Sequence, residues 1–270
     1  MNTTPPDNMP RRVTVADRYS ADAEVYEKTW APVLRPRGKE LLECLPLALA
    51  RRVLDAGSGV GALLGDIQEA APSADVFAVD CSIGMLVRAP ERFPRVIMDV
   101  LRLGFAPATF DVVVLAFMLF HLEEPQQALR EVRRVLRPGG TVGTITWDGE
   151  PAFPAELAFE EELDAAGAVE EDRGFTRHEP LGTPARMREQ LLEAGYAGVH
   201  AWSTPFALQY RLDEFVSLRT TKGRTRRRFE SLEPEARRRF LERLQSRLSA
   251  MVPSDFMDQA LLIYATGVRR

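Results

Sequence analysis

The sequence predicts an α/β fold built on a doubly wound, mostly parallel β-sheet. Short apolar runs alternate with helical patterns from Arg51 to Trp147, which is typical of parallel strands joined by crossover helices. The first run ends at a glycine-rich turn. The fourth run, at 110–116, is apolar almost throughout, as expected for a strand that is covered on both faces. The connections between the parallel strands of this sheet should be right-handed crossovers.

The segment before the first strand is expected to be helical. Met1 to Pro10 is polar and proline-rich, which predicts a loosely attached tail and no secretory signal. From Val13 to Leu49 the apolar spacing predicts an N-terminal helical cap, broken near Pro32 and Pro36 because proline removes a helical hydrogen bond.

The core elements follow in order. Strands are expected at 51–55, 75–80, 96–99, 110–116 and 141–147, and helices at 62–71, 82–89 and 125–136. Ser82 is the expected N-cap of the second helix, which Pro90 stops. Pro125 suits the first turn of the third helix, and Pro138-Gly139-Gly140 is expected to form a turn.

After Trp147 the alternation of strand and helix patterns becomes less regular. Thr183-Pro184 opens a helix that Gly195 closes, and strands are expected at 199–203 and 260–268. Residues 212–248 are mostly helical in pattern and rich in arginine. One face of 235–248 is apolar, so the arginines form either a solvated face or a site for an anion. Residues 206–253 thus predict a helical insertion before the last strand, which would act as a lid over a substrate.

Composition excludes several classes of protein. The chain has 270 residues, a net charge of −4 and an ordinary share of hydrophobic residues, 45%, which fits one domain over 1–270 with an N-terminal cap at 13–49 and a core at 50–147. The charge gives no general attraction to nucleic acid or to anionic membranes. Two cysteines suggest no disulfide framework, so we expect a cytoplasmic location. The apolar runs are too short to cross a bilayer.

The glycine turn is the strongest local signal for a ligand. Gly57, Gly59 and Ala62 satisfy the dinucleotide pattern G-x-G-x-x-A, and Asp80 ends the second strand where it can hold ribose hydroxyls. Asp55, however, lies at the opening of the turn, where its carboxylate would repel a pyrophosphate and attract an ammonium group. Asp99 ends the third strand, where an adenine amino group can be bound.

Several motifs in sequence order resemble those of class I S-adenosylmethionine-dependent methyltransferases, particularly the small-molecule branch with ubiquinone/menaquinone-type enzymes. VLDAGSGVG resembles their glycine motif, and AVDCS resembles their second-strand motif. MDVLRLGFAPATFDVVV and FHLEEPQQALREVRRVLRPGG resemble the segments that follow. Tyr19 through Tyr26 is similar to a cap motif of the same family. The resemblance covers roughly residues 18 to 147 strongly, and Ser58 and Cys81 depart from the family's usual residues.

The resemblance implies a Rossmann-like sheet with an antiparallel last strand, and S-adenosyl-L-methionine as cofactor, with S-adenosyl-L-homocysteine as product. Asp55 would face its methionine end, Asp80 the ribose hydroxyls and Asp99 the adenine. The residues expected at the cofactor are Tyr19, Asp55, Gly57, Gly59, Asp80, Cys81, Met85, Asp99, Val100 and Ala116. Met85 fits core packing equally well, and Cys81 is expected to be a buried small hydrophobe.

Other aromatic residues are expected at the acceptor. Tyr19, Tyr26 and Trp30 would form a lid over the cofactor, with Tyr26 and Trp30 touching the acceptor as well. Trp147, at the end of a strand, would form a wall of the acceptor pocket. No metal site is predicted.

His121 is the candidate catalytic residue. It follows the fourth strand, at the rim where ligands bind in doubly wound sheets. Imidazole titrates near neutral pH, so His121 suits a base that takes a proton from the acceptor or a group that orients it. A helix cap or core edge is the alternative role. His178 and His200 are expected to be structural or exposed.

The sequence therefore predicts methyl transfer to an oxygen, nitrogen or carbon of a small molecule in natural-product biosynthesis, by a monomer or homodimer. A nucleic-acid methyltransferase is a second hypothesis. The charge and the absence of an Asn/Asp-Pro-Pro-aromatic motif at Ala116-Phe117-Met118-Leu119 argue against it. A non-catalytic cofactor-binding scaffold and an NAD-dependent oxidoreductase are further alternatives; the intact Asp55 and Asp80 argue against the scaffold.

Overall fold

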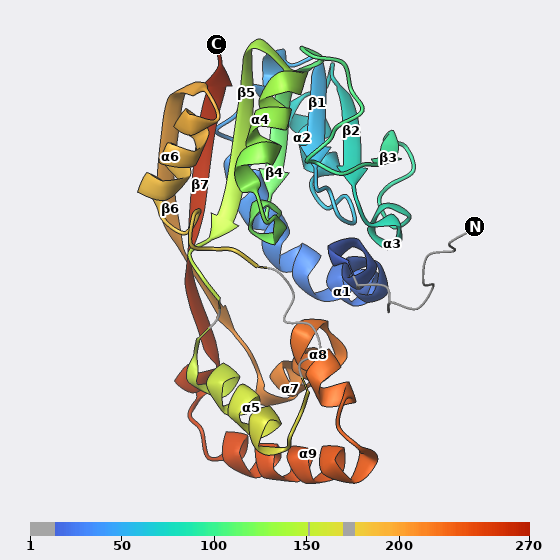
Figure 1. The fold of residues 1–270 in the computed structure, drawn as a ribbon, viewed down its shortest axis with the longest axis vertical. Helices are drawn as coiled ribbons and strands as arrows, with labels where there is room; N and C mark the ends of the chain where they lie inside the picture. The colour runs from blue at the N-terminus through green and yellow to red at the C-terminus, as the bar shows by residue number, and fades with distance from the viewer. Residues whose placement is uncertain (1–13, 151, 170–175) are drawn as a thin grey trace, which may run out of the picture.

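The computed structural model describes residues 14–150, 152–169 and 176–270 (Figure 1). A seven-stranded sheet with the order β3-β2-β1-β4-β5-β7-β6 forms the centre of the protein. The strands are β1 (Arg52–Ala56), β2 (Asp75–Asp80), β3 (Arg95–Ile97), β4 (Phe110–Ala116), β5 (Leu136–Trp147), β6 (Tyr196–Gln209) and β7 (Met257–Arg269). The first five pair in parallel, whereas β7 is antiparallel to both of its neighbours. The predicted fold class is confirmed. The tail predicted at 1–10 lies outside the described residues.

Two strands differ clearly from the sequence-based expectation, whereas the ends of β1, β3 and β7 shift by only one to three residues. The predicted turn at Pro138-Gly139-Gly140 is wrong, because β5 already begins at Leu136, which pairs with Phe110. Gly139 has a φ of 79°, and the pairing register shifts between Phe110 and Val112, so the strand accommodates these residues as an irregularity. The predicted strand at 199–203 is too short, because β6 pairs with β7 along most of its 14 residues.

The N-terminal helix α1 (Val15–Leu42) also differs from the expectation. Pro32 and Pro36 lie inside it, so the predicted break is wrong. Figure 1 shows that α1 changes direction along its length, as expected where proline removes hydrogen bonds. Packing compensates for this loss, since Leu41 and Leu42 are buried against the sheet.

Local sequence signals explain the ends of the other helices. These are α2 (Leu64–Ala70), α3 (Ile83–Leu86), α4 (Pro125–Val135), α5 (Pro154–Ala165), α6 (Pro184–Glu193), α7 (Leu212–Thr221), α8 (Gly223–Glu230) and α9 (Pro234–Ser249). Ser82 caps α3 by accepting a hydrogen bond from the Met85 amide, although α3 ends before the expected residue 89. Thr183 caps α6 in the same way, and Gly195 follows its end with a φ of 87°.

The core lies on both faces of the sheet. Along β4, Val112 and Val114 pack toward α1 and α2, while Val113 and Leu115 pack toward α4 and α6. All four are fully buried, which explains why this strand is apolar except for Asp111. Helices on both faces leave only the ends of the strands open to a ligand.

A second lobe lies at the far end of the long β6–β7 ribbon (Figure 1). It contains α5, α7, α8 and α9, so α5 joins the segment 206–253 although it precedes that segment in sequence. Its core is separate from the two cores of the sheet and includes Phe159, Phe215, Phe240, Leu244 and Leu248. Three of these come from the apolar face predicted for 235–248.

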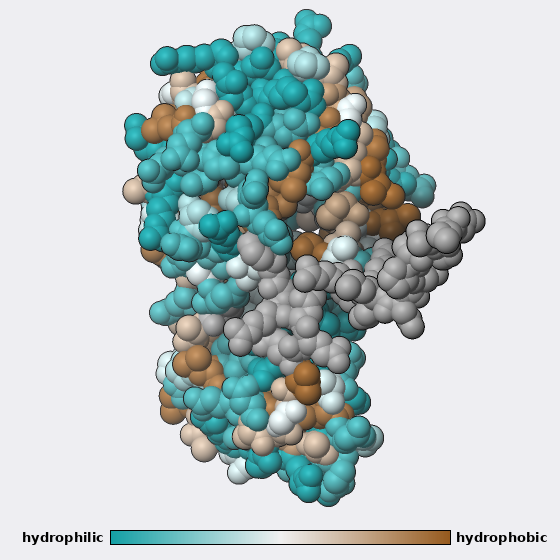
Figure 2. Space-filling model, in the orientation of Figure 1, coloured by the Kyte–Doolittle hydropathy of each residue, from teal (hydrophilic) through white to brown (hydrophobic). Residues whose placement is uncertain are grey.

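Acidic partners neutralise many arginines of this lobe. Figure 2 shows that the visible surface of both lobes is mostly hydrophilic. Glu160 of α5 binds Arg224 at 2.8 Å and also pairs with Arg228, which is buried. Arg243 binds Glu162 at 2.9 Å. These contacts disfavour an anion site, and the burial of Arg228 means that the arginines are not simply a solvated face either. In the described ranges, no helix combines the length and apolarity that crossing a bilayer requires.

Candidate functional site

The glycine loop after β1 begins the candidate site. The amides of Gly57 and Ser58 both donate to the carbonyl of Val79 in β2, at 2.8 and 3.0 Å. Gly57 has a φ of 78°, and a Cβ there would lie 2.8 Å from Cγ of Met118. Only glycine fits this position without strain or displacement, which leaves the backbone accessible at the carboxyl end of the strands.

Asp80, at the end of β2, organises this loop. Its Oδ2 accepts a hydrogen bond from the Gly59 amide and its Oδ1 accepts one from the Ser82 amide, both at 2.8 Å. Burial raises the pKa of Asp80, while these two hydrogen bonds act in the opposite direction. The carboxylate therefore joins the glycine loop to the start of α3.

Asp55 provides a second carboxylate at the end of β1. Its side chain is buried, and burial together with the nearby charge of Asp80 raises its pKa to about 7. Within the described part of the chain, neither Asp55 nor Asp80 pairs with an arginine or lysine. One buried and one partly buried acid without a cationic partner form a site that favours a positively charged ligand.

A cavity of about 500 Å³ opens in front of the glycine loop. All the residues predicted to bind the cofactor except Asp55 line it, as do Tyr26, predicted at the acceptor, and His121: Tyr19, Tyr26, Gly57, Gly59, Asp80, Cys81, Met85, Asp99, Val100, Ala116 and His121. The sequence did not single out several other lining residues, namely Thr14, Met98, Leu101, Phe117, Met118 and Leu122. Their only sequence signal is adjacency to the ends of strands and to the start of α1. Cys81 was expected to be buried but is exposed.

Asp55 faces a smaller neighbouring cavity of about 50 Å³. Tyr26, Gly57, Gly59 and Phe117 line both cavities, so the two are adjacent. The large cavity offers room for a nucleoside-sized ligand beside Asp80 and Asp99. The small one places the buried acid Asp55 at its inner end.

Trp30 and Trp147 line neither of these cavities. Their rings meet edge to face at 6.4 Å, and the Trp147 ring lies 5.3 Å from that of Phe117. Phe117 has a positive φ of 56°, which is strained for an aromatic residue, and follows β4 directly. Phe117 therefore takes the wall position expected for Trp147, and nothing in the sequence indicated it.

His121 ends a short 3₁₀ helix, Leu119–His121, on the rim of the large cavity. Its Nε2 lies 2.7 Å from the hydroxyl of Tyr19, and the two rings meet edge to face at 5.2 Å. Burial raises the pKa of Tyr19 above its ordinary value, so its hydroxyl stays protonated within hydrogen-bond distance of Nε2. The contact joins the N-terminal helix to the rim of the sheet.

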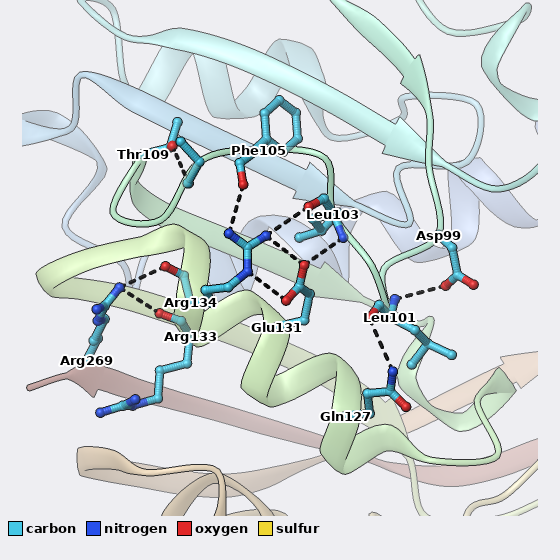
Figure 3. A network of polar contacts seen from close by, with 11 residues as sticks. Asp99, Leu101, Leu103, Phe105, Thr109, Gln127, Glu131, Arg133, Arg134 and Arg269 are labelled. Atoms are coloured by element: carbon cyan, nitrogen blue, oxygen red, sulfur yellow. Dashed lines mark hydrogen bonds and ion pairs between the residues drawn. The ribbon is translucent and has the colours of Figure 1, made fainter.

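The loop after β3, which carries Asp99, is held by α4 (Figure 3). Oδ1 of Asp99 accepts a hydrogen bond from the Leu101 amide at 2.9 Å. Farther along the loop, Glu131 accepts one from the Leu103 amide at 2.8 Å. Arg134 donates to the carbonyls of Leu103 at 2.8 Å and Phe105 at 2.9 Å. Side chains of α4 thus fix the backbone beyond Asp99, which lines the cavity.

Replacing Arg134 by alanine is expected to lower the free energy of unfolding by about 1–2 kcal/mol, because two loop carbonyls lose a charged donor and Glu131 loses its partner. Urea unfolding followed by circular dichroism measures this change. Arg130→Ala, an exposed arginine on the same helix, is the matched control and should change stability little. Equal stabilities of the two variants would contradict the assigned role of Arg134.

Comparison with known protein families agrees with this geometry. Residues 54–143 match the family model described as a methyltransferase domain, which covers β1, the glycine loop and most of the parallel sheet. The chain is 37% identical over 103 residues to a demethylmenaquinone methyltransferase of Mycolicibacterium paratuberculosis. That match covers 38% of this chain and 44% of the relative, so it spans less than half of either protein.

Two solved structures are similar over nearly the whole chain. The YcgJ protein of Bacillus subtilis superposes with a TM-score of 0.55 and 17% identity, covering 87% of this chain and 99% of that protein. Phosphoethanolamine N-methyltransferase 2 of Haemonchus contortus, solved with S-adenosyl-L-methionine, gives a TM-score of 0.53 and 18% identity. It covers 96% of this chain and 58% of that one. At these identities the likeness concerns the fold.

Proposed function

We propose that this chain, whose core is a class I S-adenosylmethionine-dependent methyltransferase domain, transfers a methyl group from S-adenosyl-L-methionine to a small-molecule acceptor. The observation that carries the proposal is the pair of acids around the glycine loop, the buried Asp55 and the partly buried Asp80, neither of which pairs with a cation among the described residues. A sulfonium cofactor with an ammonium group supplies the missing positive charge, whereas a dinucleotide pyrophosphate would be repelled.

The residues of the cavity fit this cofactor. Asp80 would bind the ribose hydroxyls, Asp55 the ammonium group and Asp99 the adenine amino group. A Cβ atom at Gly57 would lie too close to the side chain of Met118, so only a residue without a side chain fits at this position beside the ligand. When bound, the cofactor supplies an electrophilic methyl group that its own positive charge activates, so the protein's task is to position the acceptor and exclude water.

The cap contributes to both tasks. Tyr19 and Tyr26 of α1 line the large cavity, where their rings would cover the cofactor. His121 would orient the acceptor, or take its proton where the acceptor is a hydroxyl or a carbon acid. The hydroxyl of Tyr19 lies at Nε2 of His121. A proton of the acceptor would therefore reach Nε2 either through the Tyr19 hydroxyl or after the acceptor displaces that hydroxyl.

Support for a small acceptor comes from two directions. The relative from Mycolicibacterium paratuberculosis is named for the methylation of demethylmenaquinone, a small molecule. Many arginines that a nucleic-acid enzyme would need for backbone contacts are paired with acids of the same lobe.

The proposal extends to a role in secondary metabolism and to a cytoplasmic monomer or homodimer. The free thiols of Cys44 and Cys81 are consistent with a reducing compartment.

Binding and turnover test the proposal directly. Isothermal titration calorimetry should give a measurable affinity for S-adenosyl-L-methionine or S-adenosyl-L-homocysteine and none for NAD. Labelled S-adenosyl-L-methionine incubated with metabolite extracts should then yield a labelled small product. Tight NAD binding without sulfonium binding would refute the proposal, and methylation of bulk RNA or DNA at the rate of any metabolite would refute the acceptor class.

Cofactor binding should depend on pH through Asp55. Its pKa of about 7 means that much of the free protein carries a neutral Asp55 below neutrality, whereas an ammonium ligand needs the carboxylate. Raising the pH from about 6 to about 7.5 should therefore tighten binding roughly eightfold, the ratio of the ionised fractions, with release of protons below neutrality. Calorimetry in two buffers of different ionisation enthalpy measures both. Asp55→Asn should bind weakly at every pH; a wild-type pH dependence in that variant would contradict the assignment.

A further inference from the structure

Lys222 occupies the junction between the second lobe and the N-terminal helix. It lies between α7 and α8, and the neighbouring Gly223 amide donates to Oδ2 of Asp22 in α1 at 3.0 Å. Arg226 binds the other carboxylate oxygen of Asp22 at 3.2 Å. Asp22 is buried, so these contacts hold the junction firmly against α1.

The amine of Lys222 lies against two aromatic rings of α1. Its Nζ is 4.6 Å from the ring centroid of Tyr26 and 5.1 Å from that of Trp30. Among the residues that the structure describes, no carboxylate forms an ion pair with it. Burial lowers the pKa of Lys222 to about 7; the charge of Asp22 opposes this shift and that of Arg219 adds to it. Cation–π contacts offset only part of the cost of burying an ammonium group.

The other cations near this lysine have partners of their own. Arg219 binds Glu156 at 2.5 Å, and Arg226 binds Asp22. Of these three cations, Lys222 is the one that could accept an anion without giving up an existing ion pair.

An aromatic wall links Lys222 to the cavity. Tyr26, whose ring lies under the amine, lines both the large and the small cavity. Trp30 contacts Trp147, which contacts Phe117, and Phe117 lines both cavities as well. The wall therefore runs from the two cavities to Lys222, which itself lines neither cavity and lies over the rings of Tyr26 and Trp30 at the outer edge of the wall.

Building on the methyltransferase function proposed above, we propose that the acceptor is a planar molecule with an acidic oxygen, a carboxylate or an ionised phenol, that binds Lys222 while its ring packs on this aromatic wall. The anion supplies the counter-charge that Lys222 lacks. The flat rings of Tyr26 and Phe117, which line both cavities, favour a planar molecule over a flexible chain.

Matched probes test this proposal without knowledge of the natural acceptor. With the protein saturated in S-adenosyl-L-homocysteine, calorimetry compares 2-naphthoate with its neutral isostere 2-naphthamide. We expect the acid to bind about tenfold more tightly, the gain of a charge-assisted contact. Lys222→Met should abolish this preference and Lys222→Arg should keep most of it. Lys28→Met, which removes an exposed lysine of α1, is the control and should retain the full preference.

The wild-type protein alone provides a second readout. The absorbance of 4-nitrophenol reports its ionisation, and binding beside Lys222 should lower its pKa by about one unit. An unchanged or raised pKa, or a naphthoate that binds no better than naphthamide, overturns the proposal. So does a preference that survives Lys222→Met, which would leave Lys222 a purely structural contact. Binding of S-adenosyl-L-homocysteine is measured in the same titrations, so its absence reports failure of the methyltransferase proposal itself.

Discussion

Replacing Asp80 by alanine is expected to weaken the binding of S-adenosyl-L-methionine by about ten- to a hundredfold, corresponding to roughly 1.5–3 kcal/mol. The same carboxylate would bind the ribose and already holds the amides of Gly59 and Ser82 at 2.8 Å. Its removal therefore costs direct contacts to the ligand and also loosens the loop that shapes the cavity. Isothermal titration calorimetry measures the change in affinity.

Two further variants separate these effects. Asp80→Asn keeps one carbonyl oxygen that can accept a single amide hydrogen bond, so its affinity should fall between those of the wild type and the alanine variant. Asp75→Ala removes an exposed aspartate at the opposite end of the same strand and should leave binding unchanged. Unchanged affinity in Asp80→Ala, with normal thermal unfolding, would remove Asp80 from the cofactor site.

Replacing His121 by alanine is expected to lower turnover by about a hundredfold or more if His121 is the general base. Cofactor affinity should change little, because the acids that would bind the cofactor lie on other strands. A smaller loss would indicate that His121 only orients the acceptor, as for an amine or an activated carbon. Single-turnover kinetics with saturating acceptor, together with cofactor titrations, distinguish these outcomes.

The hydrogen bond between Tyr19 and His121 makes Tyr19→Phe the informative partner variant. If the proton travels through the Tyr19 hydroxyl, Tyr19→Phe should slow turnover about as much as His121→Ala, and the double variant should be no slower. If the acceptor displaces this hydroxyl, Tyr19→Phe should retain most of the activity. His200→Ala, an exposed histidine on β6, is the control. Wild-type turnover and acceptor affinity in His121→Ala would make His121 structural.

Much of the candidate site could be read from local sequence. The strands β2 and β4 have the predicted bounds, because a buried strand between helices needs a continuous apolar run. Asp80 is the last residue of β2, and Asp99 lies two residues beyond the end of β3. Parallel strands bring their carboxyl ends to one edge of the sheet, so the order of the motifs was enough to place both residues at one cavity.

Other features depended on contacts between distant parts of the chain. The helix α1 continues through Pro32 and Pro36 because it is packed on the sheet, and no local pattern contains that packing. The positive φ of Phe117, which puts its ring where Trp147 was expected, depends on how β4 meets its surroundings.

The position of the second lobe also depends on contacts between distant parts of the chain. The amide of Gly223 binds Asp22 across 201 residues of sequence, and this contact brings Lys222 to the aromatic face of α1. The sequence by itself determined the sheet and the acids at its edge, since periodicity and strand ends are local properties of the chain. Only the tertiary structure decided which side chains complete the wall of the site, because that choice depends on packing between segments that no local pattern connects.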